Sequence, residues 1–224
     1  MTEQGLENTS FLYPFLESRE TDAKSLLDDL AASAREKSME SAVLQHDSLV
    51  EYEQALTLAG NQMADRFGCG GRLFTFGNGG SATDAATLAG LFSHPARGRP
   101  IAAWSLSSDA AVLTALGNDV GFELIFARQL IAHARERDIA IALSTSGSSA
   151  DLILAITEAN RRGLLTIGFS GHGGGRMADA GLDHCFTVRS QSVHRIQESH
   201  AMLGYRLWAV VQSGLRGALP GAGA

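Results

Sequence analysis

The spacing of apolar residues changes once along this chain, near Gly71. Before that point apolar residues recur at helical intervals, which predicts two helices over residues 22–36 and 47–67. Glycines at positions 68, 70 and 71 predict the end of the second helix. Its buried side is expected to carry Leu49, Tyr52, Leu56, Leu58, Ala59 and Met63.

Beyond Gly71, short apolar runs alternate with segments of helical character. The runs, expected to be strands, are Leu73–Phe76, Ile101–Leu106, Ile139–Leu143, Leu164–Phe169 and His184–Val188. Helices are predicted over residues 82–93, 109–117, 121–135, 149–162, 173–180 and 193–215. This alternation predicts an α/β fold, with a mostly parallel five-stranded sheet covered on both faces and preceded by the N-terminal helices. In such open sheets, ligands bind beyond the carboxyl ends of the strands.

Length, charge and cysteine content limit the domain organisation, the binding partners and the cellular location that the sequence predicts. The 224 residues suit one domain over residues 22–215, with an N-terminal arm at 1–21 and a flexible, glycine-rich tail at 216–224. The net charge of −6 argues against direct nucleic-acid binding. No apolar run is long enough for a membrane span, and the first residues lack a signal-peptide pattern. Cys69 and Cys185 lie far apart without metal-ligand spacing, so we expect reduced thiols and a cytoplasmic protein.

A glycine-rich loop follows the first predicted strand, with the sequence Gly77-Asn78-Gly79-Gly80-Ser81-Ala82. A strand that ends in glycines before a helix leaves unpaired backbone N–H groups at the helix N-terminus, where the helix dipole favours an anion. Glycine lets the backbone approach an oxyanion, and Ser81 adds a hydroxyl donor. This glycine loop (residues 77–82) predicts a phosphate-binding site, and it matches neither the dinucleotide-binding pattern nor the P-loop.

A second polar loop follows the strand predicted at Ile139–Leu143. This serine loop (residues 144–149) has the sequence Ser144-Thr145-Ser146-Gly147-Ser148-Ser149 and supplies five hydroxyl groups. Serine-rich turns commonly do no more than cap the next helix. Since a glycine loop ends another strand of the same predicted sheet, the combination favours a phosphorylated ligand between the two loops.

Four motifs resemble those of a known family and occur in the same order. They are Gly77–Ala82, Gly117-Asn118-Asp119, Ser144–Gly147 and Arg195-Ile196-Gln197-Glu198. This order is typical of phosphoheptose (sedoheptulose-7-phosphate) isomerases, which belong to the SIS (sugar isomerase) domain family, and the resemblance spans about residues 22–215. It implies a three-layer αβα sandwich and a homotetramer whose sites form between subunits. The ligand-binding residues that it implies are Asn78, Gly79, Gly80, Ser81, Asn118, Asp119, Ser144, Thr145, Ser146, Ser149 and Gln197.

The resemblance fails at three of the four metal-ligand positions. In the isomerases the helix after the glycine loop carries a His and, four residues later, a Glu that also transfers a proton; these positions are Thr87 and Leu91 here. The final helix of the family carries a Gln and, eight residues later, a His; Gln197 is kept, but the second position is Tyr205. Thr and Tyr hydroxyls are poor ligands for zinc, and Leu is none. We therefore expect no metal and no other cofactor.

His194 and Glu198 are candidates for a relocated acid/base pair. They lie four residues apart, so they can share one face of a helix. The interpretation that we favour is a solvated pair at the start of the helix. His94, just past the helix after the glycine loop, is a further candidate.

The sequence favours a sugar-phosphate-binding protein that has lost most of the isomerase's metal and catalytic residues and acts in binding or regulation. The resemblance offers a precedent, a bacterial initiator-associating protein of this family with an incomplete metal site, which binds the replication initiator as a tetramer. Nothing in the chain identifies such a protein partner. The alternative is an aldose–ketose isomerase of sedoheptulose 7-phosphate or a related phosphosugar that uses relocated groups. A third hypothesis is an assembly role with an empty glycine loop.

Overall fold

The computed structural model describes residues 23–217 of the chain. Helix α1 spans Ala23–Gly68, so the prediction of two separate helices is wrong. No glycine or proline lies in residues 37–46, and nothing there interrupts the backbone hydrogen bonds. The chain divides into two units between Ala42 and Val43. The arm predicted at residues 1–21, and the predicted tail beyond Gly217, lie outside the described residues.

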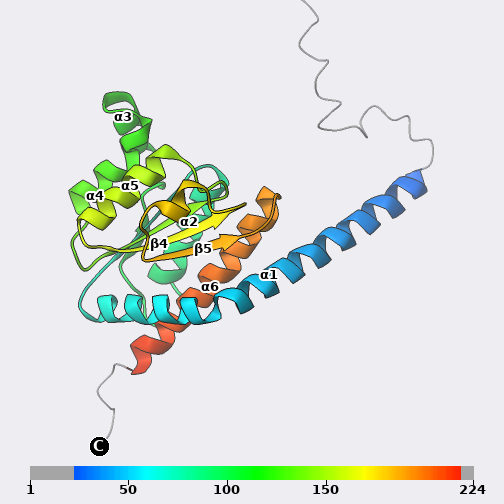
Figure 1. Ribbon diagram of the computed structural model, residues 1–224, viewed down its shortest axis with the longest axis horizontal. Helices are drawn as coiled ribbons and strands as arrows, with labels where there is room; N and C mark the ends of the chain where they lie inside the picture. Colours follow the sequence, from blue (N-terminus) through cyan, green and yellow to red (C-terminus); the bar gives the residue numbers. More distant parts are fainter. Residues whose placement is uncertain (1–22, 218–224) are drawn as a thin grey trace, which may run out of the picture. The chain divides into compact units, whose positions relative to one another are not determined.

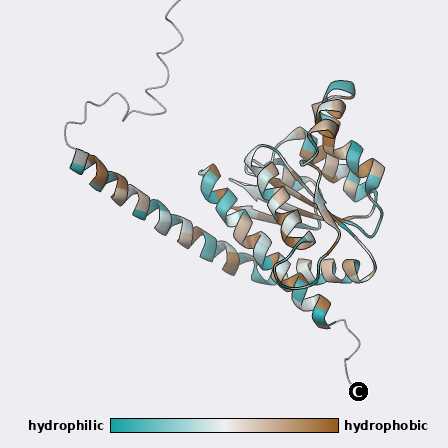
Figure 2. Cartoon of the chain, turned by 180° about the vertical axis from the view of Figure 1, so that it is seen from behind, coloured by the Kyte–Doolittle hydropathy of each residue, from teal (hydrophilic) through white to brown (hydrophobic). Residues whose placement is uncertain are grey.

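In the first unit, residues 23–42 of α1 carry several exposed apolar side chains, including Leu27, Leu30 and Met39. Brown bands along this end of the helix show the apolar residues in Figure 2. A helix with apolar residues exposed in this way lacks a hydrophobic core of its own.

The second unit is built around a five-stranded parallel sheet with the order β2-β1-β3-β4-β5 (Figure 1). Its strands are β1 (Leu73–Gly77), β2 (Ala103–Ser105), β3 (Ile139–Ser144), β4 (Leu165–Gly171) and β5 (His184–Val188). The α/β fold and its five strands are thereby confirmed. Strand β2 is shorter than the predicted run Ile101–Leu106, since only three of its residues form a strand.

The helices are α2 (Gly80–Ser93), α3 (Ala110–Asp119), α4 (Ile125–His133), α5 (Ala150–Arg161) and α6 (Val193–Gly217). Two predicted helices are shorter or tighter than expected. The segment predicted at 121–135 divides into a 3₁₀ turn, η2 (Phe122–Leu124), and α4. The segment at 173–180 is the 3₁₀ turn η3 (Gly175–Asp179), because Gly174 and Gly175 have positive φ angles that an α-helix does not allow.

Helices pack on both faces of the sheet, which confirms the three-layer αβα arrangement. On one face, α2, α6 and the Val43–Gly68 part of α1 bury residues such as Leu56, Phe92 and Leu207 against the sheet. On the other face, α4 and α5 pack against Phe74 and Phe76. Leu58, expected on the buried side of α1, is 54% exposed. Within residues 23–217, no helix combines the length and the apolar character that a membrane crossing needs.

Candidate functional site

The glycine loop and the serine loop lie side by side at the carboxyl edge of the sheet. Strands β1 and β3 are neighbours, and Gly77 pairs with Leu143 at the last position of their register. On the other side of β3, Ser144 pairs with Ser170 of β4. This register brings the loops after β1, β3 and β4 to one edge, where an open parallel sheet binds its ligands.

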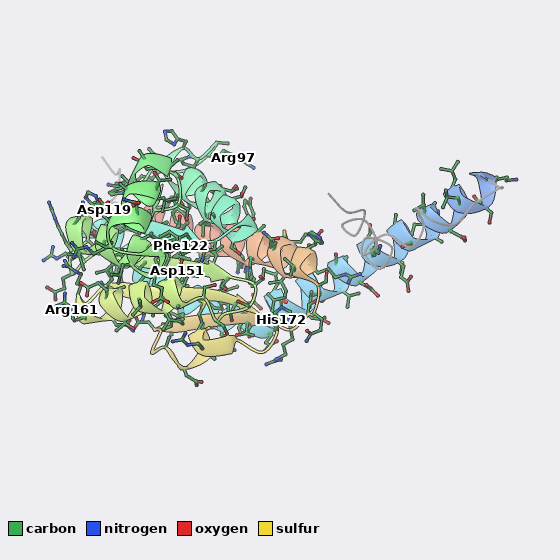
Figure 3. All side chains as sticks on the ribbon, turned by 90° about the horizontal axis from the view of Figure 1, so that it is seen from above. Arg97, Asp119, Phe122, Asp151, Arg161 and His172 are labelled. Atoms are coloured by element: carbon green, nitrogen blue, oxygen red, sulfur yellow. The ribbon has the colours of Figure 1, made fainter. Side chains whose placement is uncertain are left out.

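A hydrogen-bonded pair joins the glycine loop to the helix that follows the serine loop. The Nδ2 atom of Asn78 donates to both carboxylate oxygens of Asp151, at 3.1 and 2.9 Å. Asp151, labelled in Figure 3, is almost fully buried in the first turn of α5. The pair fixes the distance between the two loops before any ligand arrives.

The helices that begin at these loops have no side-chain N-caps. Neither Gly79, before α2, nor Ser149, before α5, makes a side-chain capping bond. In contrast, Asp109 caps α3 by accepting from the backbone N–H groups of Ala111 and Val112. First-turn N–H groups without a capping side chain are free to bind an anion, which the helix dipole also attracts.

The serine loop is fixed by a hydrogen bond within it and by a second one from η3. Ser144 Oγ accepts from the N–H of Gly147 at 3.0 Å, and the N–H of Met177 donates to the carbonyl of Gly147 at 2.8 Å. Gly147 has a φ of 64°, and any Cβ there would collide with the carbonyl of Gly174. The loop thus presents the exposed Ser146 and the half-buried Thr145 from a fixed frame.

Gln197 of α6 packs against the start of α2. Its Nε2 atom donates to Asp84 Oδ2 at 2.9 Å. A Cβ at Gly80 would meet the Gln197 amide, so this glycine allows α6 to approach the loop. Burial raises the pKa of Asp84, and the hydrogen bond from Gln197 opposes that rise. Gln197 and Asp84 therefore form one polar pair beside the glycine loop.

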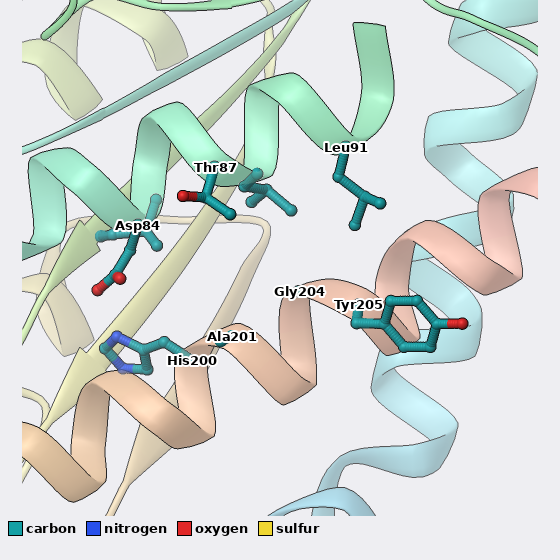
Figure 4. A pocket seen from close by; sticks show the side chains of 9 residues that line it. Asp84, Thr87, Leu91, His200, Ala201, Gly204 and Tyr205 are labelled. Atoms are coloured by element: carbon teal, nitrogen blue, oxygen red, sulfur yellow. The ribbon is translucent and has the colours of Figure 1, made fainter. Parts of the chain in front are cut away.

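A small cavity lies between α2 and α6 next to this pair (Figure 4). Its volume is about 70 Å³, and it is lined by Asp84, Thr87, Leu88, Leu91, Leu143, His200, Ala201, Gly204 and Tyr205. Three of these residues stand at the positions where the resemblance places metal ligands. The Thr87 hydroxyl donates to the carbonyl of Thr83 at 2.9 Å, and the Tyr205 ring packs against Trp208 with centroids 5.4 Å apart. Across residues 23–217, no three His, Cys, Asp or Glu side chains come together as a metal site.

His200 is the one histidine that lines this cavity, and it is buried. The sequence predicts for it only an ordinary interface or partly buried histidine. Its Nε2 atom donates to the carbonyl of Ser170 at 2.9 Å, so Nδ1 is the unprotonated nitrogen of the neutral ring. Burial lowers the pKa of His200 to about 4. Nδ1 has no hydrogen-bond partner among the described residues. The only signal in the sequence is its position three residues after Gln197, which places both on one helix face.

Other candidate residues lie apart from the two loops. Asn118 Nδ2 donates to Asp119 Oδ1 at 2.9 Å, and both side chains are exposed at the end of α3 (Figure 3). In the described part of the chain, no hydrogen bond links this pair to either loop. His194 and Glu198 are both exposed at the start of α6, and no bond between them is found within residues 23–217. His94 Nδ1 lies 2.9 Å from the Ser93 hydroxyl at the end of α2.

Comparisons with known proteins agree with the fold. A family model described as SIS domain matches residues 39–171. The chain is 41% identical over 148 residues to a phosphoheptose isomerase of Rhodospirillum rubrum, covering 65% of this chain and 78% of that relative. It is 36% identical over 181 residues to phosphoheptose isomerase 2 of Campylobacter jejuni, covering 79% and 90%. The solved phosphoheptose isomerase of Neisseria gonorrhoeae superposes with a TM-score of 0.74 at 32% identity, covering 84% of this chain and 99% of that one. The chain belongs to the SIS domain family, in the group that contains the phosphoheptose isomerases.

Proposed function

We propose that this protein binds a phosphorylated sugar at the glycine and serine loops and acts in binding or regulation rather than as an isomerase. Sedoheptulose 7-phosphate is the first ligand to test, because relatives at about 40% identity are named phosphoheptose isomerases. The phosphate would lie between the uncapped starts of α2 and α5. Backbone N–H groups there, with the hydroxyl of Ser146, supply donors without any positively charged side chain.

The residues that line the cavity between α2 and α6 support the proposal that this protein is not an isomerase. Moving a proton between adjacent carbons needs a base positioned at the substrate. The positions of the family's metal ligands and base hold Thr87, Leu91 and Tyr205. A hydroxyl bonded to its own helix, an aliphatic side chain and a phenol do not fit a zinc site. Gln197 donates through Nε2 to Asp84, so its Oε1 is the one ligand atom of the family's metal site that this chain keeps, and one amide oxygen does not make a zinc site.

The first experiment measures binding and turnover on the same protein. Calorimetric titration with sedoheptulose 7-phosphate is expected to give saturable binding, whereas an isomerase assay is expected to give no product with or without added zinc. Gly79→Asp is expected to weaken binding at least about tenfold more than Gly79→Asn, because the two differ by one negative charge beside the phosphate. Turnover that depends on His194, Glu198 or His200 would establish the alternative, a relocated acid/base mechanism.

A reconstitution tests the same assignment in the opposite direction. The triple variant Thr87→His, Leu91→Glu, Tyr205→His supplies three ligands beside Gln197, and we expect it to bind zinc measurably more tightly than the wild type. The matched control, Thr83→His, Leu58→Glu, Tyr52→His, places the same residue types outside the cavity. Equal zinc binding by the wild type and the triple variant would contradict the proposed loss of the metal site.

We further infer a homotetramer, as the resemblance implies. Large apolar side chains of the second unit are exposed in the single chain, including Phe122 at 61% and Val120 at 39%. Exposed apolar side chains of this size favour burial between subunits. Light scattering with size-exclusion chromatography tests this inference, and a monomeric mass at working concentration would contradict it.

A further inference from the structure

A second depression lies between the segment after α2 and the C-terminal part of α6, and it shares only Tyr205 with the small cavity between α2 and α6. Its volume is about 770 Å³. Arg97, Arg99 and Arg216 contribute to its lining, and no carboxylate does. We call it the arginine depression. In Figure 3, Arg97 lies apart from Asp151 and His172, which mark the carboxyl edge of the sheet.

The three arginines of the depression differ from those arginines of the second unit that form ion pairs. The ion-paired arginines are Arg72, Arg161, Arg162, Arg189 and Arg206. Within residues 23–217, no ion pair involves Arg97, Arg99 or Arg216. On a chain with a net charge of −6, three guanidinium groups around one depression create a local positive potential that attracts an anion.

The segment that carries two of these arginines is fixed in place by Gln212. This side chain is almost fully buried, its Oε1 atom accepts from the N–H of Arg99 at 2.7 Å, and its Nε2 atom donates to the Arg99 carbonyl at 2.9 Å. Gly98 has a φ of 101°, and a Cβ there would collide with the Gln212 amide. A backbone held at both polar groups presents its side chains from a rigid base, which reduces the entropy lost on binding.

Two aromatic rings complete the depression. Tyr205 is 51% exposed, and its ring lies against that of Trp208. The indole N–H of Trp208 is buried and has no acceptor among the described residues. Planar rings stack on exposed aromatic side chains, and guanidinium groups bind phosphate oxygens in bidentate pairs.

We propose that the arginine depression binds a nucleoside diphosphate at a site separate from the sugar-phosphate loops. The guanidinium groups of Arg97, Arg99 and Arg216 bind the two phosphates, and the base stacks on Tyr205. Two phosphate groups match three guanidiniums better than one phosphate does, because each guanidinium can pair with its own oxygens. The aromatic rings of the depression favour a ligand that carries a nucleobase over a simple inorganic ion.

Titration calorimetry of the full-length protein with ADP and with inorganic pyrophosphate tests this proposal. We expect both to bind, with ADP tighter, and affinity to fall as salt rises. The double variant Arg97→Gln, Arg99→Gln is expected to weaken both ligands about tenfold or more, whereas Arg128→Gln, an exposed arginine of α4, leaves both unchanged. Tyr205→Phe keeps the ring and should keep ADP affinity, whereas Tyr205→Ala should weaken ADP about fivefold and leave pyrophosphate unchanged.

Three results would overturn the proposal. The first is no binding of either ligand by the wild type. The second is equal affinity for ADP and pyrophosphate, which removes the role of the aromatic side. The third is displacement of ADP by sedoheptulose 7-phosphate, which would place ADP at the loops. Because Arg97 and Arg99 lie outside the loops, the double variant should bind the sugar phosphate normally, so failure here leaves the proposed function standing. Circular dichroism checks that the variants fold.

Discussion

The amino and carboxyl edges of the sheet differ in how their polar groups are hydrogen-bonded. At the amino edge, Asp138 directly precedes β3 and is nearly inaccessible to water. Its carboxylate accepts from the N–H of Arg72 at 2.9 Å, from the Arg72 Nη2 atom at 2.6 Å and from the N–H of Arg135 at 2.8 Å. Asp183, before β5, similarly accepts from the Thr166 N–H at 2.8 Å. The polar groups of this edge are used within the fold.

At the carboxyl edge, two helix N-termini are left without side-chain caps. Gly79 and Gly80 are exposed, and no side chain of residues 23–217 caps α2 or α5. The polar pair Asn78–Asp151 lies behind the loops and holds them in position. The amino edge therefore uses its polar groups within the fold, whereas the carboxyl edge leaves the N-termini of α2 and α5 without side-chain caps. Substitutions at the two edges should therefore have separable effects on stability and on binding.

The largest effect on stability is expected at the amino edge. Asp138→Ala removes the carboxylate that accepts from two N–H groups and from the Arg72 guanidinium, which keeps its bond to the His133 carbonyl. Breaking a largely buried ion pair by removing one member costs about 3 kcal/mol. Chemical denaturation measures the change. Asp109→Ala, which removes only the cap of α3, is the control and should cost about 1 kcal/mol. Equal losses in the two variants would mean that the amino edge has no special role in stability.

His200 makes the carboxyl edge sensitive to acid. Burial lowers its pKa to about 4 in the folded protein, against about 6.5 when unfolded. Between these values the unfolded chain binds more protons, so the contribution is fully present above about pH 6.5 and is lost as pH falls towards 4. The difference between the two pKa values of His200 corresponds to at most about 3 kcal/mol in the free energy of unfolding.

His200→Gln isolates this contribution, because a glutamine amide can donate to the Ser170 carbonyl in place of Nε2. Denaturation at a series of pH values should show a flatter acid limb for the variant than for the wild type. His133→Gln, an exposed histidine at the end of α4, is the control and should keep the wild-type slope. Parallel pH profiles for wild type and His200→Gln would show that His200 is not buried in its neutral form.

A smaller loss of stability is expected when the hydrogen bonds between Asn78 and Asp151 at the carboxyl edge are removed. Asn78→Asp replaces the Nδ2 donor by a second carboxylate beside Asp151, so two hydrogen bonds become a like-charge contact. We expect a loss of about 2 kcal/mol at neutral pH and weaker binding of the sugar phosphate. The matched control is Asn118→Asp, which makes the same change beside Asp119 on an exposed helix end and should cost under about 0.5 kcal/mol. Similar losses at both positions would contradict a positioning role for Asn78.

The strands of this edge could be predicted from the sequence because buried parallel strands are continuous apolar runs. His184–Val188 and Ile139–Leu143 were located in this way, and the loops after β1 and β3 followed from their glycines and serines. Helix α1 was predicted in two pieces because exposed helical residues carry no periodic apolar signal.

Contacts between distant residues left no local pattern in the sequence. Asn78 and Asp151 are 73 positions apart, and Asp84 and Gln197 are 113 apart. Only the register of β1 with β3, and the packing of α2 on α6, bring these pairs together. For His200 the sequence predicts an interface or partial burial, but its bond to the carbonyl of Ser170, at the end of another strand, could not be predicted.

Ser146→Ala has the smallest expected effect on stability, so a change in its ligand affinity can be attributed to binding and not to folding. The Ser146 hydroxyl is exposed, and its bonds within the described residues are long: it accepts from the Ser148 N–H at 3.3 Å and lies 3.5 Å from Ser144 Oγ. Ser146→Ala should therefore change the free energy of unfolding by less than about 0.5 kcal/mol. If the hydroxyl donates to the phosphate, affinity should fall about fivefold, the equivalent of one hydrogen bond. Ser108→Ala, an exposed serine at another turn, should change neither quantity. A loss of stability without a loss of affinity would show that Ser146 stabilises the domain and does not bind the phosphate. That result would contradict the proposed difference between the two edges at this residue.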